Sequence, residues 1–348
     1  MRKYLLPEGG NFYKANLHCH TVLSDGKKTA EEVKNLYTEK GYSVVAYTDH
    51  DIMIPHDELT DENFLALHGF EMEVNPPKTE GNPYEKTCHV CFIGIDKENI
   101  TQPMWHKTKY RFGNAPKYEH LVKIDESEPD FEREYTPECI SEMMRIGREK
   151  GFFVTYNHPT WSMENYNDYI HYDGMHCFEI MNGCLAFGWD EYNSHEYDDF
   201  LRAGKRIFCM GADDNHNYAE PTSHFFDSFH AFTMIKAEKL EYNTITKALL
   251  SGDFYASEGP EIKELYWEEG KVHIETSPAD RIYCTFGIRR AGVIYRSEEA
   301  PVTAATFGIP KEAVYFRFTV VDEKGRRAFS NAYFIDEMPD DYPKEDEK

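Results

Sequence analysis

The sequence predicts an α/β protein with a closed or nearly closed barrel of parallel strands, followed by a small all-β region. Short apolar runs alternate with helical segments over residues 1–255. This alternation is typical of parallel strands joined by crossover helices. About seven such units occur, which favours a barrel over an open sheet. From about residue 257 helical signals become sparse and strand-like runs follow one another.

The predicted barrel strands are short and mostly apolar, as strands buried on both faces should be. They cover residues 12–17, 42–47, 64–70, 88–94, 152–156, 176–181 and 206–211, with a further strand at 229–235. Capping residues mark the helices. Thr29 and Glu32 form a capping box before a helix that ends at Gly41, and Thr136 opens a helix that ends at Gly151. Further helices are expected over about 190–203 and 243–251.

Three regions depart from this alternation. Residues 96–135 form a long polar insertion, and a loop of this length is usually functional or disordered. The insertion is therefore either a lid over a site or a mobile surface segment. Residues 256–336 are predicted to form an antiparallel β-domain, with strands at 272–275, 282–288, 314–321 and 332–335. Residues 337–348 form an acidic tail that we expect to be frayed.

Composition limits the classes of function. The chain of 348 residues is 41% hydrophobic, enough to bury a sizeable core. Its net charge of −24 disfavours nucleic acids and anionic membranes as partners. No apolar run is long enough for a membrane span or a signal peptide, so we expect a cytoplasmic protein. The 8 cysteines form no C-x-x-C pair, which predicts reduced, mostly buried thiols instead of a cysteine zinc site.

Histidines and carboxylates follow or end most of the predicted strands. His18 and His20 are two residues apart, so on a strand their imidazoles share a face, and Asp25 follows in a turn. Two imidazoles and a carboxylate suit zinc, iron or manganese. Similar residues recur along the barrel, whose carboxyl strand ends gather on one side. The candidate ligands are His18, His20, Asp25, His50, Glu71, His89, His158, Asp214 and His216.

As a spaced set, these motifs resemble those of the PHP (polymerase and histidinol phosphatase) family. The family pattern is H-x-H with a following S-D-G, then T-D-H, G-x-E, a strand-borne His, H-P and D-x-H. Here the motifs stand as His18-Cys19-His20, Ser24-Asp25-Gly26, Thr48-Asp49-His50, Gly69-Phe70-Glu71, His89, His158-Pro159 and Asp214-Asn215-His216. The resemblance covers residues 11–255. The later region, especially 253–260, is similar to that of PHP proteins grouped with carbaryl-type metallohydrolases.

The resemblance implies a distorted (β/α)7 barrel that holds two or three divalent ions (zinc, iron or manganese) and hydrolyses phosphate esters. One metal would bind His18, His20, Glu71 and Asp214. Glu71 would bridge to a second metal held by His89 and His158, and a third would bind Asp25, His50 and His216. The segment before the last D-x-H is one residue longer here than in the family, so Asp213 remains an alternative to Asp214. Asp49 is either an acceptor that fixes an imidazole tautomer or a strand-end cap.

The leading hypothesis is a metal-dependent phosphoesterase acting on a small phosphorylated substrate. A hydroxide formed from a metal-bridging water would attack phosphorus, with Glu71 as the bridge and Asp25 or His216 moving protons. Arg111, Lys107 or Lys109 are candidates for a phosphate clamp. One alternative is hydrolysis of a carboxylic ester, amide or carbamate, and another is a non-catalytic metal- or carbohydrate-binding protein. The sequence leaves the oligomeric state open.

Overall fold

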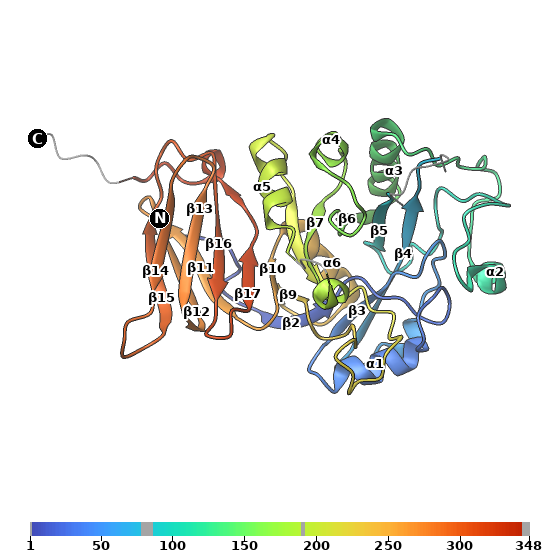
Figure 1. Ribbon diagram of the computed structural model, residues 1–348, viewed down its shortest axis with the longest axis horizontal. Coiled ribbons are helices and arrows are strands. Elements are labelled where there is room, and N and C mark those ends of the chain that lie inside the picture. The colour runs from blue at the N-terminus through green and yellow to red at the C-terminus, as the bar shows by residue number, and fades with distance from the viewer. Residues whose placement is uncertain (1, 78–85, 189–191, 343–348) are drawn as a thin grey trace, which may run out of the picture.

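The computed structural model describes residues 2–77, 86–188 and 192–342. Most of its strands belong to one large sheet in the order β14-β13-β16-β17-β10-β9-β2-β3-β4-β5-β6-β7-β8. Figure 1 shows the strands that follow β10 at one end of an elongated molecule and helices α1 to α3 toward the other. The first part of the sheet comprises β2 (Asn11–Asn16), β3 (Val44–Tyr47), β4 (Leu65–Val74), β5 (Cys88–Gly94), β6 (Phe152–Asn157), β7 (Cys177–Asn182) and β8 (Phe208–Ala212).

The seven predicted barrel strands are present, but they are not all parallel. β2, β3 and β4 run parallel to one another, and so do β6, β7 and β8. β5 is antiparallel to both β4 and β6, so the prediction of a uniformly parallel repeat was wrong there. Val74 pairs directly with Cys88, so the chain folds back after β4 as in a hairpin and needs no crossover helix.

The segments that follow the two outer strands of this group, β2 and β8, also meet. Cys19 and Asn215 form a parallel bridge, and the main-chain N–H of His20 donates to the carbonyl of Asn215 at 3.1 Å. The N–H of Asp214 donates in turn to the carbonyl of His18 at 3.0 Å. The carboxyl ends of β2 and β8 therefore lie side by side, although far apart in the sequence.

The helices lie between strands and largely follow the capping signals. Thr29 and Glu32 form the predicted capping box, and the Thr136 side chain accepts from the N–H of Cys139. The α-helices are α1 (Ala30–Thr38), α2 (Ala115–Tyr118), α3 (Pro137–Glu149), α4 (Tyr166–Tyr169), α5 (Ser194–Arg202) and α6 (Tyr242–Ser251). The 3-10 helices are η1 (Asp57–Leu59), η2 (Glu119–Leu121), η3 (Gly183–Phe187) and η4 (Ile335–Glu337). The predicted start of α5 near residue 190 lies outside the described residues.

The later strands are antiparallel. They are β9 (Phe232–Ala237), β10 (Phe254–Ser257), β11 (Ile262–Glu268), β12 (Lys271–Ala279), β13 (Arg281–Phe286), β14 (Ala291–Tyr295), β15 (Val302–Gly308), β16 (Tyr315–Val321), β17 (Arg327–Ser330) and β18 (Tyr333–Phe334). β10 pairs with both β9 and β17 and so joins this region to the large sheet. β1 (Lys3–Tyr4) pairs with β11, so the start of the chain lies with this region. The domain boundary at residue 255 stays a prediction.

The final segment is not frayed where the structure describes it, contrary to expectation. The ring of Tyr342 packs edge-on against Trp267 at 5.4 Å, and the indole N–H of Trp267 donates to Asp341 at 2.7 Å. The remainder of the predicted tail, residues 343–348, lies outside the described residues. All eight cysteines are free, as predicted, and six of them are buried: Cys19, Cys88, Cys91, Cys177, Cys209 and Cys284.

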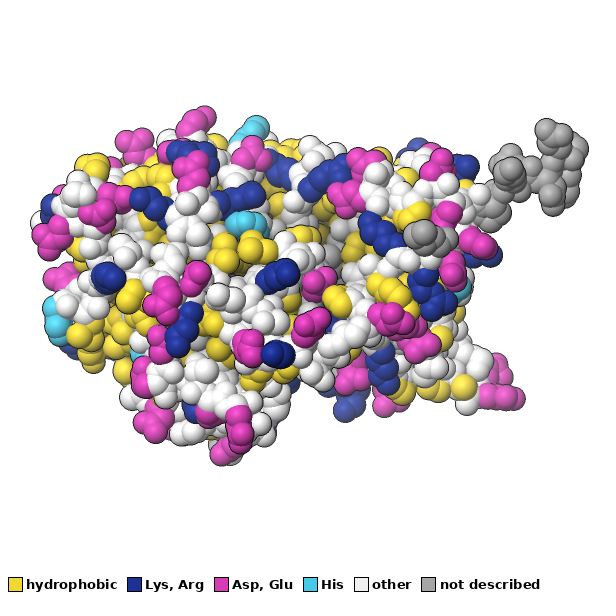
Figure 2. Space-filling view, turned by 180° about the vertical axis from the view of Figure 1, so that it is seen from behind, with side chains coloured by type: hydrophobic (Ala, Val, Ile, Leu, Met, Phe, Trp, Pro, Cys, Tyr) yellow, Lys and Arg dark blue, Asp and Glu magenta, His cyan; other side chains and the backbone are white. Residues whose placement is uncertain are grey.

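One face of the molecule is mixed in charge despite the acidic composition. Figure 2 shows acidic and basic side chains interspersed over one face, with no large area of a single sign. Among the described helices, none is both long and apolar enough to span a membrane.

Candidate metal centre

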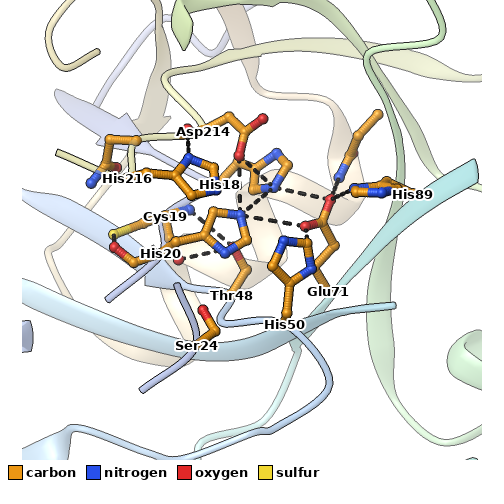
Figure 3. Close-up of polar contacts among 12 residues, drawn as sticks. His18, Cys19, His20, Ser24, Thr48, His50, Glu71, His89, Asp214 and His216 are labelled. Carbon is orange, nitrogen blue, oxygen red and sulfur yellow. Dashed lines mark hydrogen bonds and ion pairs between the residues drawn. The ribbon is translucent and has the colours of Figure 1, made fainter. Parts of the chain in front are cut away.

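The nine candidate ligands converge on one largely buried region at the carboxyl side of the first strands. Figure 3 shows most of them, with His18, His20, His50, Glu71, His89, Asp214 and His216 labelled. His18 and His20 directly follow β2, and His50 follows β3. Glu71 and His89 lie within the paired strands β4 and β5, where β5 runs the other way. His158 follows β6, and Asp214 and His216 follow β8, while Asp25 lies in the turn after His20. The spaced motifs of the sequence therefore meet in three dimensions.

Glu71 lies at the middle of this cluster and presents its two oxygens to two different groups of histidines. Oε1 lies 3.1 Å from Nε2 of His18, 3.1 Å from Nδ1 of His89 and 3.6 Å from Nε2 of His158. Oε2 lies 3.3 Å from Nε2 of His20 and 3.2 Å from Nδ1 of His50. One carboxylate thus connects two sets of imidazoles, which is the arrangement a bridging ligand needs.

Asp214, and not Asp213, faces this cluster. Oδ1 of Asp214 lies 3.2 Å from Nε2 of His18 and 3.0 Å from Nε2 of His20. Asp213 points the other way and accepts from the Tyr37 hydroxyl at 2.8 Å and from the N–H groups of Phe229, His230 and Ala231. Asp214 has a φ of +52°, a left-handed conformation that is costly for a non-glycine residue and often found at functional sites.

A further group lies on the solvent side of the cluster. His20, Asp25, His50 and His216 each offer a ligand atom, and these atoms lie within 4.8 Å of one another. Nε2 of His216 is 3.3 Å from Oδ2 of Asp25. The S-D-G turn is close-packed, since a Cβ on Gly26 would lie 2.6 Å from the carbonyl oxygen of His20. The glycine therefore allows the turn to bring Asp25 back over the histidines.

Glu179, inside β7, is a part of the site that sequence reasoning missed. Its Oε1 lies 3.1 Å from Nδ1 of His18, and its Oε2 accepts from the N–H of His158 at 3.0 Å. A carboxylate at Nδ1 fixes the ring so that Nε2 is free to bind a cation. The only available signal was an acidic residue within an apolar, fully buried strand.

Asp49 does not contact a candidate ligand's imidazole in the described structure and instead caps the turn after the H-x-H motif. Its Oδ1 accepts from the N–H groups of Thr21 and Ser24, and its Oδ2 accepts from the Thr21 hydroxyl at 2.7 Å. Of the two roles considered for Asp49, the strand-end cap is the one observed.

Charges within the buried cluster perturb one another strongly. Burial lowers the pKa of His18, but Asp214, Glu71 and Glu179 outweigh it and hold that pKa well above its usual value. Burial raises the pKa of Glu71, but His18, His89 and His50 outweigh it and hold the pKa well below its usual value. Burial, helped by positive charge on His20 and His89, outweighs Glu71 and Asp25 and holds the pKa of His50 well below its usual value. The buried carboxylates Asp214, Glu71 and Glu179 thus favour a positive charge in the space around His18.

The donor set fits divalent cations. Among the described residues, four atoms of the cluster are buried without a hydrogen-bond partner: Nδ1 of His20, Nδ1 of His50, Oε2 of Glu71 and Nε2 of His89. Buried polar atoms rarely remain unpaired, so such a group indicates a missing partner. The ligand-to-ligand distances of 3.0 to 3.6 Å around Glu71 and Asp214 match the edge of a tetrahedral site. For bonds of about 2.1 Å to nitrogen and oxygen, that edge is about 3.4 Å.

The 96–135 insertion packs against the centre. The ring of Phe112 lies edge-on to His50 at 4.9 Å, and the N–H of Asn114 donates to the carbonyl of Ser24 at 2.6 Å. A cavity of about 230 Å³ lies beside it, lined by Asp51, Glu73, Asn75, Tyr110, Arg111, Phe112 and Arg133. The insertion therefore borders the centre, which suits a lid.

The basic residues proposed as a phosphate clamp are mostly engaged elsewhere. Lys109 pairs with Glu132, and Arg111 pairs with Glu119 and lies 3.5 Å over the ring of Trp105. The Lys107 main chain donates to Asp130 within the insertion. The side chain of Arg133, which sequence reasoning missed, is 5% exposed and pairs with Asp51 at 2.6 Å, next to His50. Arg111 and Arg133 line the cavity beside the centre, but within the described residues neither forms an ion pair or hydrogen bond with a candidate ligand.

Comparison with known proteins gives similarities at low identity. No family model matches the sequence, and no curated protein matches it. A two-domain protein from Bacteroides vulgatus containing a predicted PHP-like metal-dependent phosphoesterase is 16% identical, with a TM-score of 0.44. That similarity covers 94% of this chain and 98% of the other.

Two further solved structures are similar over shorter lengths. A candidate metal-dependent phosphoesterase from Bifidobacterium adolescentis is 16% identical over 63% of this chain and 91% of its own, with a TM-score of 0.40. An amidohydrolase from Chromobacterium violaceum, with bound sulfate and no metal, is 14% identical over 58% of this chain and 87% of its own, with a TM-score of 0.36. The chain is thus similar to proteins described as containing a PHP-like metal-dependent phosphoesterase, as a metal-dependent phosphoesterase and as an amidohydrolase.

Proposed function

We propose that this chain is a metal-dependent hydrolase of the PHP type that cleaves phosphate esters of small molecules. The observation that carries the proposal is Glu71, whose two oxygens face separate groups of histidines at 3.1 to 3.6 Å. A carboxylate shared in this way is what two neighbouring cations require. The proposal includes a distorted (β/α)7 barrel, supported by the meeting of the β2 and β8 ends.

The residues divide into three ligand groups in this proposal. His18, His20 and Asp214 would hold one cation, His89 and His158 a second, and Asp25, His50 and His216 a third, with Glu71 shared between the first two. This division follows the family resemblance. The two oxygens of Glu71 divide the histidines differently, since Oε1 faces His18 together with His89 and His158, and Oε2 faces His20 together with His50. Bound divalent ions of this kind supply a water of lowered pKa and neutralise charge on phosphoryl oxygens. Zinc, iron and manganese all suit imidazole and carboxylate ligands.

The chain's own groups prepare the site for that chemistry. Glu179 holds the His18 ring so that Nε2 faces Glu71 and Asp214. Asp25 and His216 are the most exposed members of the cluster, with side chains 15% and 16% exposed. With two cations bound, Asp25 and His216 hold no metal, and in this proposal Oδ2 of Asp25 and Nε2 of His216 then pass a proton between bound substrate and solvent. The other six described histidine and glutamate ligands are almost fully buried, which keeps bulk water away from them.

The test combines metal content with turnover. Protein purified without chelator is assayed for zinc, iron and manganese and for hydrolysis of p-nitrophenyl phosphate, as wild type and as Glu71→Ala. Glu298→Ala, which changes an exposed glutamate on the surface, is the matched control. We expect two or three metal ions per wild-type chain, with metal and activity lost only in Glu71→Ala.

Other outcomes are equally informative. Stoichiometric metal with turnover of p-nitrophenyl acetate but not of the phosphate would replace the phosphoesterase proposal with carboxyl-ester hydrolysis. No stoichiometric metal after reconstitution with any of the three ions would contradict the ligand assignment.

A further inference from the structure

Three aromatic side chains stand around the solvent side of the metal centre. Phe112, Trp161 and Tyr218 come from three separate segments of the chain, and they are 44%, 41% and 63% exposed. Large aromatic side chains are costly to leave in water, so a group of them beside a site indicates a ligand surface. We call these three residues the aromatic rim.

Each rim residue contacts a candidate ligand through its ring. Phe112 lies edge-on to His50 at 4.9 Å, and Trp161 lies edge-on to His89 at 5.4 Å and to His158 at 5.1 Å. Tyr218 stacks on His216 at 5.9 Å. The rim thus contacts candidate ligands of the second and third groups, namely His50, His89, His158 and His216.

The main chain at and beside the rim residues is hydrogen-bonded. The loop that carries Trp161 folds back on itself, with the N–H of Ser162 donating to the carbonyl of His158 at 3.1 Å. The N–H of Phe112 donates to Asp51, and the N–H of Asn217, next to Tyr218, donates to Asp227. Aromatic side chains on an ordered main chain bind a ring at low conformational-entropy cost, because each has only two rotatable side-chain bonds.

A positive charge beside the rim suits the negative charge of a phosphate ester. Nζ of Lys27 lies 4.4 Å from the centre of the Tyr218 ring, which places a positive charge beside the entrance. The phosphoryl group and the rest of the ester would then face different surroundings. The phosphoryl group would enter among the histidines and carboxylates, and the leaving group would remain at the rim.

We propose that the rim is a leaving-group subsite and that the preferred substrates are phosphate monoesters whose leaving group carries a flat, apolar ring. This inference rests on the proposed phosphoesterase function and adds the substrate class. Stacking and edge contacts between aromatic rings contribute about 0.5–1.5 kcal/mol each beyond the burial of apolar area. A ring at the rim should therefore bind about tenfold more tightly than a methyl group.

The test measures binding as well as turnover. Phenylphosphonate and methylphosphonate, which are not hydrolysed, are titrated calorimetrically into metal-loaded protein. We expect wild type to bind phenylphosphonate about tenfold more tightly, and Trp161→Ala and Phe112→Ala to lose most of that preference while binding methylphosphonate as before. Trp161→Phe should keep most of the preference because it retains a ring.

The matched control is Tyr295→Ala, which removes a tyrosine that is 60% exposed on β14, in the antiparallel region outside the predicted barrel. It should leave the preference unchanged, and metal content is measured for every variant. Equal affinity of wild type for the two phosphonates, with phosphate esters still cleaved, would overturn the rim proposal alone. If Trp161→Ala weakened the binding of both phosphonates by the same factor, the indole would have a purely structural role, and the rim proposal would be overturned. Failure of both phosphonates to bind, with no phosphate ester cleaved, would overturn the phosphoesterase function and the rim proposal together.

Discussion

Nδ1 of His18 lies 3.1 Å from Oε1 of Glu179, and this contact directs the opposite ring nitrogen toward Glu71 and Asp214. Both residues are completely buried, so neither has water as an alternative partner. Glu179 also accepts from the N–H of His158 and from the Asn182 amide. One carboxylate therefore sets the orientation of His18 and the backbone position of His158.

Replacing Glu179 should weaken metal binding without removing a proposed ligand. We expect Glu179→Gln to lower metal affinity by about 10-fold to 100-fold, as is usual when the outer partner of a ligating histidine is lost. Competition with a chelator of known affinity measures the effect, and Glu298→Ala serves as the control. An affinity equal to that of wild type would show that His18 is oriented by other contacts.

The adjacent residues Asp213 and Asp214 should respond in opposite ways. Asp214→Asn should lose metal and keep most of its folding stability, because its carboxylate faces the cluster. Asp213→Asn should retain metal and lose about 1–3 kcal/mol of stability, because hydrogen bonds from Tyr37 and three N–H groups are disturbed. Metal analysis and urea unfolding separate the two, and metal loss in Asp213→Asn alone would reverse the assignment.

Glu164 should make stability depend on pH. Burial raises its pKa from 4.5 to about 7, although Tyr156, Tyr172 and Tyr135 donate to it and oppose the shift. Between these values the folded protein holds a proton that the unfolded chain has released. Its contribution to stability is therefore fully present below pH 4.5 and is lost as the pH rises to about 7.

The loss amounts to about 3 kcal/mol. Glu164→Gln cannot titrate, so wild type should lose about 3 kcal/mol relative to the variant between pH 4.5 and pH 7. Urea unfolding of both proteins at matched metal loading measures this difference. Parallel stability curves for the two proteins would show that the carboxyl titrates normally.

Arg317 on β16 and Asp198 on α5 form a buried pair that links the later strands to a helix of the first part of the chain. Nε and Nη2 of Arg317 each donate to Asp198 at 2.8 Å, and the Tyr315 hydroxyl adds a third contact at 3.1 Å. Arg317→Ala should cost about 3–5 kcal/mol, because it leaves the buried Asp198 side chain without its main partner.

Removing both charges should cost less than removing one. We expect the double variant Arg317→Met with Asp198→Leu to recover much of the stability lost in Arg317→Ala. Chemical denaturation of the two variants gives the comparison. Equal losses would mean that packing, and not the unpaired charge, dominates at this position.

Much of the candidate site was predictable because its residues are marked by local spacing. His18 and His20 share a face wherever they lie on an extended chain, and the strand-end positions of His50, His158 and Asp214 follow from short apolar runs. The capping box at Thr29 and Glu32 was predictable for the same reason, because its two residues are three positions apart in the sequence. Glu179 was missed because one acid within an apolar run carries no spacing signal.

The direction of β5 and the path of residues 96–135 could not be predicted in the same way. An apolar run such as 88–94 can pair with a neighbouring strand in either direction. The pairing of Val74 with Cys88 makes β5 antiparallel to β4. The insertion has little periodic pattern, and its place is set by contacts with distant residues, such as Asn114 with Ser24.

The sequence by itself determined the types of element, most of their extents and the set of residues able to bind metal, because each depends on neighbours a few positions away. The tertiary structure alone decided that Asp214 faces the cluster while Asp213 faces Tyr37, that Glu71 lies between two sets of histidines, and that Glu179 supports His18. These relationships depend on the register between strands far apart in the chain, and a shift of one residue would turn each side chain to the opposite face of the sheet.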